Sequence, residues 1–259
     1  RKGPGRVYPL AGYHNYGMMD VPLESTAGLQ PGMTVAIRDD IRRGCNETLA
    51  RITWVDDGWV GLDRGIESDY YDRANAALVT AYPLVFGRSA HGAAVRDLCL
   101  DGTREDQQAG IGTCRGAAIY FYQSDGVTLE GVKERNFMGD GTVLLMCSHL
   151  NVRQSAFNEN SGNGFHPGAG STMALFDNCE ATGNGSSGFF FCVRANHITV
   201  QHCDFGHNAK EGISIGKRDR NNLIHTCSIH DNGGPGIGFR GEPRPVEEHS
   251  VRVEYCSIA

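Results

Sequence analysis

The chain has 259 residues, of which 40% are hydrophobic, and it carries a formal net charge of −6. This length and apolar content suffice for a substantial core, whereas the negative charge gives no electrostatic reason to expect nucleic acid as a partner. No apolar run approaches the roughly 18 residues of a membrane-spanning helix, so we expect no membrane partner either.

Residues 1–82 lack the periodicity of the rest of the chain and predict a small N-terminal β subdomain. The segment from Leu29 to Arg38 has the pattern of a turn followed by a strand. Residues 48–63 predict a β-hairpin, because two apolar strands flank an Asp-Gly turn. The aromatic residues of this part are expected mainly to pack against the domain that follows, with substrate contact through His14 as the alternative.

The second region, residues 83–259, begins with irregular strand-like segments and a polar loop. The loop and its flank are acidic at Asp101, Glu105 and Asp106. Carboxylate oxygens are the ligands that Ca²⁺ prefers, so a Ca²⁺ site is the alternative to an ordinary solvated loop. No other cofactor is predicted.

From residue 160 onward, three residue types recur together at a spacing of 24 residues. They are Gly164, Gly188, Gly212 and Gly236; Asn160, Asn184, Asn208 and Asn232; and Cys179, Cys203 and Cys227. A period of 24 is too short for two helices and too long for one hairpin. It fits one coil of a solenoid with about three short strands, stacked on the next coil by parallel pairing at roughly 4.8 Å.

The repeat predicts which side chains stack inside the solenoid. One apolar column comprises Phe165, Phe189, Ile213 and Ile237, and a second comprises Pro167, Phe191, Ile215 and Phe239. The asparagines fall at a bend, where each amide can bond to the asparagines above and below it. The repeated cysteines behave as a column of small buried hydrophobes, which we favour over disulfides or a metal site.

With its asparagine ladder, stacked aliphatic columns and 24-residue coil, the chain resembles the right-handed parallel β-helix proteins of the pectate-lyase-like superfamily. The resemblance covers about Pro83 to Ala259. It implies an all-β solenoid and a polysaccharide or oligosaccharide substrate, together with a secreted or periplasmic location. The catalytic motifs of polygalacturonases and alginate epimerases are absent, so it implies a polysaccharide-active enzyme of unassigned family.

A concentration of charge on one face of the solenoid predicts the active site. If residues one and three after each glycine point inward, those two and four after it point outward. Charged side chains gather there and at the following bend within about four coils, whereas the preceding coil has the apolar run 143–147. The candidate catalytic residues are His166, Arg194, Lys217, Asp219, Arg240 and Glu242. The candidate substrate contacts on this face are Arg218, Phe190 and Ser214.

The first function that these residues predict is a lyase or epimerase acting on a uronate-containing polysaccharide. Arg194 or Arg240 would neutralise the uronate carboxylate by bidentate pairing. Lys217 or His166 would then remove the neighbouring proton, and His166 or Glu242 would protonate the leaving oxygen. The outcome is β-elimination, or epimerisation if the proton returns to the opposite face.

Two other functions fit the same residues. Asp219 and Glu242, on adjacent coils, could be the acid/base pair of a glycoside hydrolase. Alternatively, the chain is a non-catalytic glycan-binding solenoid, such as part of a spike or adhesin. The simplest alternative for each single residue is an ordinary ion pair with a neighbouring coil.

The ends of the chain lead to two further expectations. The chain starts at Arg1, without methionine or a signal segment, which suggests processing. It stops in the middle of a coil, and an uncovered strand edge pairs readily with other chains. We therefore expect either further coils beyond Ala259 or a homo-oligomer in which another subunit covers this end.

Overall fold

The structure, a computed structural model, describes residues 4–41, 47–80, 83–108, 110, 112, 114–241 and 250–259. These residues form two compact units. One contains Lys2–Pro83 together with Glu105–Gly116, and the other contains Leu84–Arg104 and Ala117–Ala259. The polar loop that interrupts the first coils therefore belongs to the N-terminal unit and not to the solenoid.

The N-terminal unit is built on a six-stranded antiparallel sheet with the strand order β1-β6-β3-β4-β5-β2. The predicted hairpin is present, because β4 and β5 pair antiparallel across the turn at Asp57 and Gly58. The strands are β1 (Val7–Pro9), β2 (Asp20–Pro22), β3 (Thr34–Arg38), β4 (Thr48–Asp56), β5 (Trp59–Leu62) and β6 (Ala77–Val79), and the 3₁₀ helices are η2 (Asp72–Ala74) and η3 (Arg104–Asp106). No helix among the described residues has the length and apolar character needed to cross a membrane.

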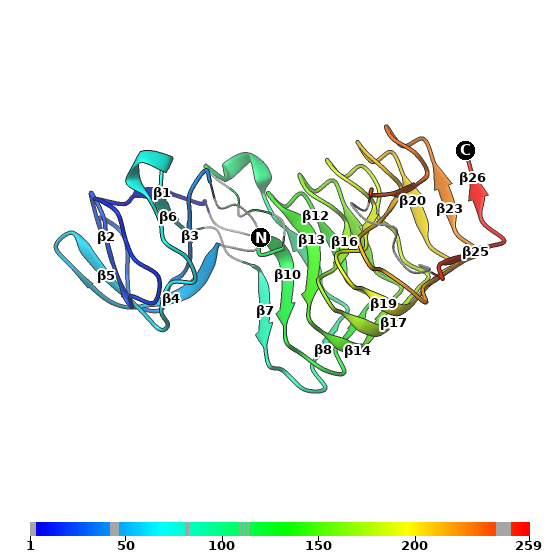
Figure 1. Ribbon diagram of the computed structural model, residues 1–259, viewed down its shortest axis with the longest axis horizontal. Helices are drawn as coiled ribbons and strands as arrows, with labels where there is room; N and C mark the ends of the chain where they lie inside the picture. The colour runs from blue at the N-terminus through cyan, green and yellow to red at the C-terminus, as the bar shows by residue number, and fades with distance from the viewer. Residues whose placement is uncertain are drawn as a thin grey trace. The chain divides into compact units, whose positions relative to one another are not determined.

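The second unit is a parallel β-helix with three faces, in which strands of successive coils lie side by side (Figure 1). The first sheet contains β7 (Val85–Arg88), β10 (Ala117–Tyr122), β13 (Asp140–Leu145), β16 (Phe165–Pro167), β18 (Phe189–Phe190), β21 (Ile213–Ile215) and β24 (Ile237–Phe239). The second sheet contains β8 (Ala94–Arg96), β11 (Thr128–Glu130), β14 (Ser148–Arg153), β17 (Thr172–Asp177), β19 (Asn196–Gln201), β22 (Leu223–His225) and β25 (Arg252–Glu254). The third face contains β9 (Cys99–Asp101), β12 (Lys133–Arg135), β15 (Ala156–Asn158), β20 (Asp204–Gly206), β23 (Ser228–His230) and β26 (Ser257–Ile258).

The register of the first sheet confirms the 24-residue phase. Phe165 pairs with Phe189, Phe189 with Ile213, and Ile213 with Ile237. The first three of these side chains are fully buried in one continuous apolar core. The rings of Phe165, Phe176, Phe191 and Phe205 have centroids 4.7–5.9 Å from that of Phe189, so aromatic packing adds to the burial that holds neighbouring coils together.

The asparagine ladder forms the predicted bonds between coils. The backbone N–H of Asn160 donates to Oδ1 of Asn184 at 3.1 Å, and that of Asn184 donates to Oδ1 of Asn208 at 3.1 Å. The side-chain amide of Asn208 also donates to the carbonyl oxygen of Ala181 at 3.0 Å. Each asparagine thus satisfies buried backbone groups at a bend where no strand ladder can do so.

The repeated cysteines are buried free thiols. Cys179, Cys203 and Cys227 have exposures of 4%, 2% and 2%. Each Sγ lies 3.5–3.7 Å from a backbone carbonyl oxygen of the coil before it. The column therefore fills the interior as small side chains with weak S–H donors, as the sequence predicts.

Candidate functional site

Three predicted site residues form a column on the outer side of the first sheet. His166 in β16 lies with its ring edge against the face of Phe190 in β18, at a centroid distance of 4.8 Å and an angle of 73°. Phe190 pairs in register with Ser214 in β21. His166 and Ser214 have exposures of 0% and 1%. The structure therefore corrects the expectation that Ser214 contacts substrate, and it places His166 beneath the surface rather than on it.

Arg240 joins this column from a coil further along. Its guanidinium lies 3.8 Å from the centroid of the Phe190 ring and donates a hydrogen bond to the carbonyl oxygen of Phe191. To reach that position, the side chain passes over Gly216, where a Cβ would collide with it. A cation stacked on an aromatic face is stabilised by the ring quadrupole. The arrangement fixes one positive charge at the sheet surface.

We expect Gly216→Ala to lower the free energy of unfolding by about 1–3 kcal/mol, as overpacking does. The added Cβ would lie 2.6 Å from the carbonyl oxygen of Cys192 and 2.8 Å from that of Phe191, and it would displace Arg240. Gly241→Ala is the control, because no atom of the described residues lies within 4 Å of a Cβ at Gly241. Equal urea midpoints for the two variants would contradict this close packing.

Asp140, which the sequence analysis did not select, is the partner of His166. Its Oδ2 lies 2.7 Å from Nδ1 of His166, and both side chains have an exposure of 0%. Its Oδ1 accepts hydrogen bonds from the backbone N–H and the side-chain amide of Asn163, at 2.7 Å and 3.1 Å. The carboxylate thus orients the imidazole while its own oxygens are satisfied.

His166 also faces a thiol. Sγ of Cys192 and a ring nitrogen of His166 lie within 4.8 Å of one another. Burial by itself lowers the pKa of His166, but hydrogen bonds to Asp140 and Cys192 raise it to about 9. The imidazole is therefore protonated at neutral pH, so in this structure it can donate a proton but cannot accept one.

Asp219 is a buried carboxyl group at the bend after β21. Its Oδ1 accepts a hydrogen bond from the N–H of Ala195 at 2.8 Å, and its Oδ2 accepts one from the N–H of Gly216 at 2.6 Å. Burial raises its pKa to about 7, against the effect of these two N–H groups and of Arg240. With both oxygens bonded to backbone at 0% exposure, Asp219 holds the bend in shape rather than facing solvent.

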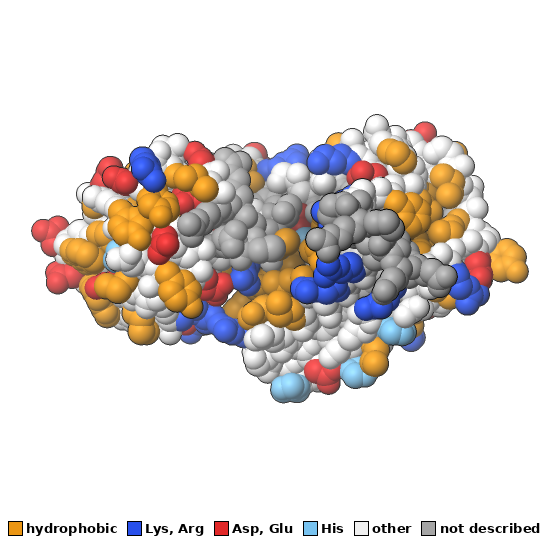
Figure 2. Space-filling view, viewed as in Figure 1, with side chains coloured by type: hydrophobic (Ala, Val, Ile, Leu, Met, Phe, Trp, Pro, Cys, Tyr) orange, Lys and Arg blue, Asp and Glu red, His pale blue; other side chains and the backbone are white. Residues whose placement is uncertain are grey.

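The remaining cations of the predicted site lie on the surface. Arg194, Lys217 and Arg218 are exposed at the bends after β18 and β21. The N–H of Arg194 donates to the carbonyl oxygen of Lys217 at 2.9 Å, so these bends lie on adjacent coils. Within the described part of the chain, none of the three forms an ion pair. Figure 2 shows basic side chains gathered over the coils that include β16 and β19.

Two predicted residues are not placed with this cluster. His14 belongs to the N-terminal unit, where it is buried at 7% exposure and its Nε2 contacts the carbonyl oxygen of Asp20. Its burial corrects the expectation of a substrate contact. Glu242 lies outside the described residues. The hydrolytic pair of Asp219 and Glu242 thus has one member that is buried and bonded to backbone.

The acidic loop gives no Ca²⁺ cluster among the described residues. Asp101 accepts a hydrogen bond from the N–H of Thr103 at 3.0 Å and lies 3.5 Å from the guanidinium of Arg135. Glu105 and Asp106 belong to the other unit. No group of side chains that is close enough to share an ion, in the part that the structure describes, includes these three carboxylates.

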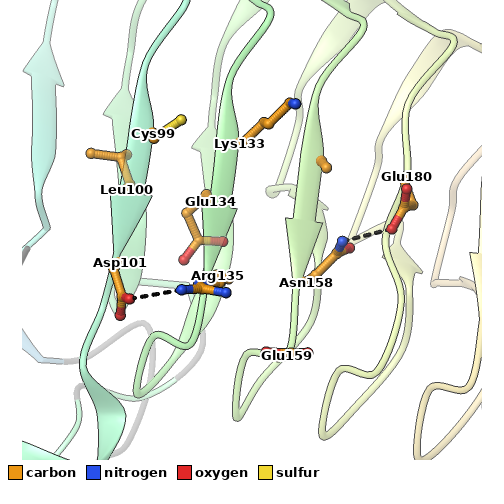
Figure 3. A pocket seen from close by; sticks show the side chains of 10 residues that line it. Cys99, Leu100, Asp101, Lys133, Glu134, Arg135, Asn158, Glu159 and Glu180 are labelled. Carbon is orange, nitrogen blue, oxygen red and sulfur yellow. Dashed lines mark hydrogen bonds and ion pairs between the residues drawn. The ribbon is translucent and has the colours of Figure 1, made fainter.

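A pocket of about 610 Å³ on the third face was not predicted from the sequence (Figure 3). Arg135 lies 3.5 Å from Asp101, and the amide of Asn158 donates to Glu180 at 2.6 Å. The pocket is lined by Cys99, Leu100, Asp101, Lys133, Glu134, Arg135, Ala156, Asn158, Glu159 and Glu180. Because four carboxyl groups and only two cations line it, the pocket is less suited to a polyanion than the exposed cations at the bends after β18 and β21.

Comparison with known proteins establishes the family. Residues 117–259, more than half of the chain, match the family model described as right handed beta helix region. The chain therefore belongs to the right-handed β-helix family, which confirms the fold that the sequence predicts. A search of curated proteins gave no significant match.

Solved structures with similar folds include enzymes that act on polysaccharides. The catalytic domain of a GH87 α-1,3-glucanase in complex with nigerose has a TM-score of 0.50 and 12% identity, covering 100% of this chain and 68% of that one. The periplasmic alginate epimerase AlgG has a TM-score of 0.49 and 15% identity, covering 57% of this chain and 32% of that one. The A-module of the Azotobacter vinelandii mannuronan C-5 epimerase AlgE4 has a TM-score of 0.46 and 20% identity, with 66% and 54% covered. The matched part thus spans about a third to a half of the epimerases, and at these identities the comparison shows the fold alone.

Proposed function

We propose that the first sheet of this β-helix binds an anionic polysaccharide and modifies its uronate units by removing the proton next to the carboxylate. The observation that carries the proposal is the set of exposed cations, Arg194, Lys217 and Arg218, that form no ion pair within the described part of the chain. Arg194 lies on one coil and Lys217 and Arg218 lie on the next, so positive charge repeats along the solenoid axis at about 4.8 Å. Such a row suits the regularly spaced carboxylates of an extended polymer.

The proposed roles follow from exposure and charge. Arg194 pairs with the carboxylate of the reacting sugar and withdraws charge from it as the neighbouring carbon loses its proton. Lys217 is the proposed base, because an amine can give up its proton and become a base whereas the guanidinium groups of Arg194 and Arg218 cannot. Arg240 adds a second positive charge. Because its side chain is already held against the Phe190 ring, it need not become ordered when substrate binds.

Of the two roles that the sequence gave His166, base or acid, a protonated imidazole fits only the acid. The Asp140 carboxylate holds this imidazole and compensates its charge, so the pair adds no net positive charge to the sheet. His166 is the proposed acid for the leaving oxygen, and substrate binding must open a path to it. A polymer of this kind is met outside the cell, so the proposal places the protein in the periplasm or in the medium.

Glycan binding without chemistry is the second candidate, and one observation favours it. The two predicted catalytic groups with raised pKa values, His166 at about 9 and Asp219 at about 7, both have an exposure of 0%. If they stay buried when the polymer binds, the cations alone give a binding surface. The assay must therefore separate binding from turnover.

We expect the protein to generate unsaturated uronate, or to exchange a sugar proton with solvent, on at least one of polygalacturonate, alginate and hyaluronate. Ultraviolet absorbance detects elimination, deuterium uptake from ²H₂O followed by NMR detects epimerisation, and new reducing ends without absorbance detect hydrolysis. Affinity electrophoresis in gels that contain each polymer measures binding separately. Dextran, a neutral polymer, is the control and should not retard the protein.

Lys217→Ala should lower the rate by about 100-fold or more, as loss of a general base does, while the polymer still binds. Lys210→Ala is the matched control, because Lys210 is also exposed but follows the third-face strand β20. Arg194→Ala should weaken binding of the uronate polymer. It should also make that binding less sensitive to salt concentration. Retardation by a uronate polymer without any turnover would support the non-catalytic candidate. Equal rates for the two lysine variants would remove Lys217 from the mechanism.

A further inference from the structure

Two coils of the third face bring two histidines and an aspartate together. His207 directly follows β20 and Asp231 directly follows β23, at equivalent positions 24 residues apart. Both residues have left-handed backbone angles, with φ of 55° and 50°. They therefore occupy the same bend, in two adjacent coils. His230, the last residue of β23, pairs in register with Gly206.

Gly206 makes room for the His230 ring. A Cβ at Gly206 would lie 2.5 Å from Cε1 of His230, so the imidazole leans over the glycine toward the neighbouring coil. In this position it is 5.3 Å from the ring of His207, at an angle of 86°. One ligand atom from each of His207, His230 and Asp231 lies within 4.8 Å of the other two. Small side-chain rotations would bring all three to a common centre.

The hydrogen bonds of His230 already have the form found around metal-bound histidines. Its Nε2 lies 2.9 Å from Oδ1 of Asp204, and its Nδ1 lies 2.9 Å from Oδ2 of Asp231. A carboxylate that accepts the N–H of one ring nitrogen fixes the tautomer and directs the other nitrogen to the metal. Asp204 would serve as that carboxylate, which leaves Nδ1 facing Asp231 and His207.

We propose that His207, His230 and Asp231 form a surface site for a divalent transition metal ion, with Zn²⁺ as the best-matched ion. Two imidazole nitrogens and one carboxylate oxygen are borderline ligands that suit Zn²⁺, and three protein ligands leave a fourth tetrahedral position for water. The ion would take the place of the proton that His230 shares with Asp231. The site lies on the third face, away from the first sheet, and does not depend on the proposed glycan chemistry.

The affinity of this site for a metal ion should depend on pH, because the ion replaces a proton on His230. A histidine binds a metal ion through an unprotonated ring nitrogen. Metal and proton therefore compete for the same nitrogen, and affinity should fall as the pH is lowered. The charged and titratable groups at this corner are His207, Asp231, Asp204 and His230 itself.

The test is a titration of the chelator-treated 259-residue chain with ZnCl₂ by calorimetry, together with Co²⁺ as a spectroscopic substitute. We expect one Zn²⁺ per chain at this site, and a Co²⁺ spectrum without the near-ultraviolet charge-transfer bands of thiolate ligands. His207→Ala and Asp231→Ala should each weaken Zn²⁺ binding by at least about ten-fold. Asp204→Asn should weaken it by a smaller factor with the stoichiometry unchanged.

His202→Ala is the matched control, since His202 is another exposed histidine on the solenoid with one aspartate partner, Asp177, at 2.9 Å. It should bind Zn²⁺ as the parent protein does. Equal affinities for His207→Ala and His202→Ala would overturn the proposal, and so would thiolate bands that assign the ion to cysteines. His207→Gln provides a second test if the alanine variant proves unstable by circular dichroism.

Discussion

Replacing Asp140 by alanine is expected to lower the free energy of unfolding by about 3–5 kcal/mol, the usual cost of removing one partner from a buried ion pair. The imidazolium of His166, at 0% exposure, would lose its compensating carboxylate. The N–H groups of Asn163 would lose their acceptor as well. Urea denaturation followed by circular dichroism measures the change.

The solenoid provides a matched control for this prediction. Asp125 and His149 also lie 2.7 Å apart, but their side chains are 49% and 62% exposed. Asp125→Ala should therefore change stability little, because an exposed ion pair is screened by water and salt. If Asp140→Ala and Asp125→Ala lowered the free energy of unfolding equally, burial would not explain the contribution of the Asp140–His166 pair to stability.

The second large effect is a loss of stability as the pH rises from about 6.5 to about 9. The pKa of His166 is raised from its ordinary value of 6.5 to about 9 in the folded protein. The folded state thus holds a proton that the unfolded state releases, so this contribution is complete below pH 6.5 and is lost through pH 9. Its full size is about 3 kcal/mol, from roughly 1.4 kcal/mol per pKa unit.

Unfolding measured at a series of pH values tests this dependence. His166→Gln removes the titrating group, so its unfolding free energy should change much less over the same interval, although the variant is less stable at pH 7. His149→Gln, with an exposed imidazole, should keep the dependence of the parent protein. A parent curve that is flat between pH 6.5 and 9 would show that His166 is neutral when folded.

The fold could be predicted because the residues that determine it recur every 24 positions in the sequence. Once Gly164, Gly188 and Gly212 set the period, the inward positions follow by counting, and Phe165, Phe189 and Ile213 are buried there. The expectation is wrong for Phe239, which is 59% exposed in the last of these coils. The same counting places Arg194 and Lys217 on exposed bends of adjacent coils. What repeats in the sequence must repeat in space when coils stack in parallel.

The chemistry of the site was less predictable because one of its groups lies outside the positions where charge was expected. Asp140 directly precedes Gly141, whereas the expected charges follow the glycine of each coil. Its contact with His166 depends on how the two side chains turn, which the period does not give. The repeat predicts which way a side chain points from the sheet, but it does not predict how exposed that side chain is. His166 and Ser214 occupy outward positions and are nonetheless buried.

Alkylation of the buried thiols Cys179, Cys203 and Cys227 can report local unfolding of the solenoid. One sulfur sits in each of three consecutive coils, all shielded from reagents while the coils stay closed. An alkylating agent can reach a given sulfur only when that coil separates from its neighbours. The order in which the three are alkylated would therefore report, coil by coil, where the solenoid frays and how far the fraying travels.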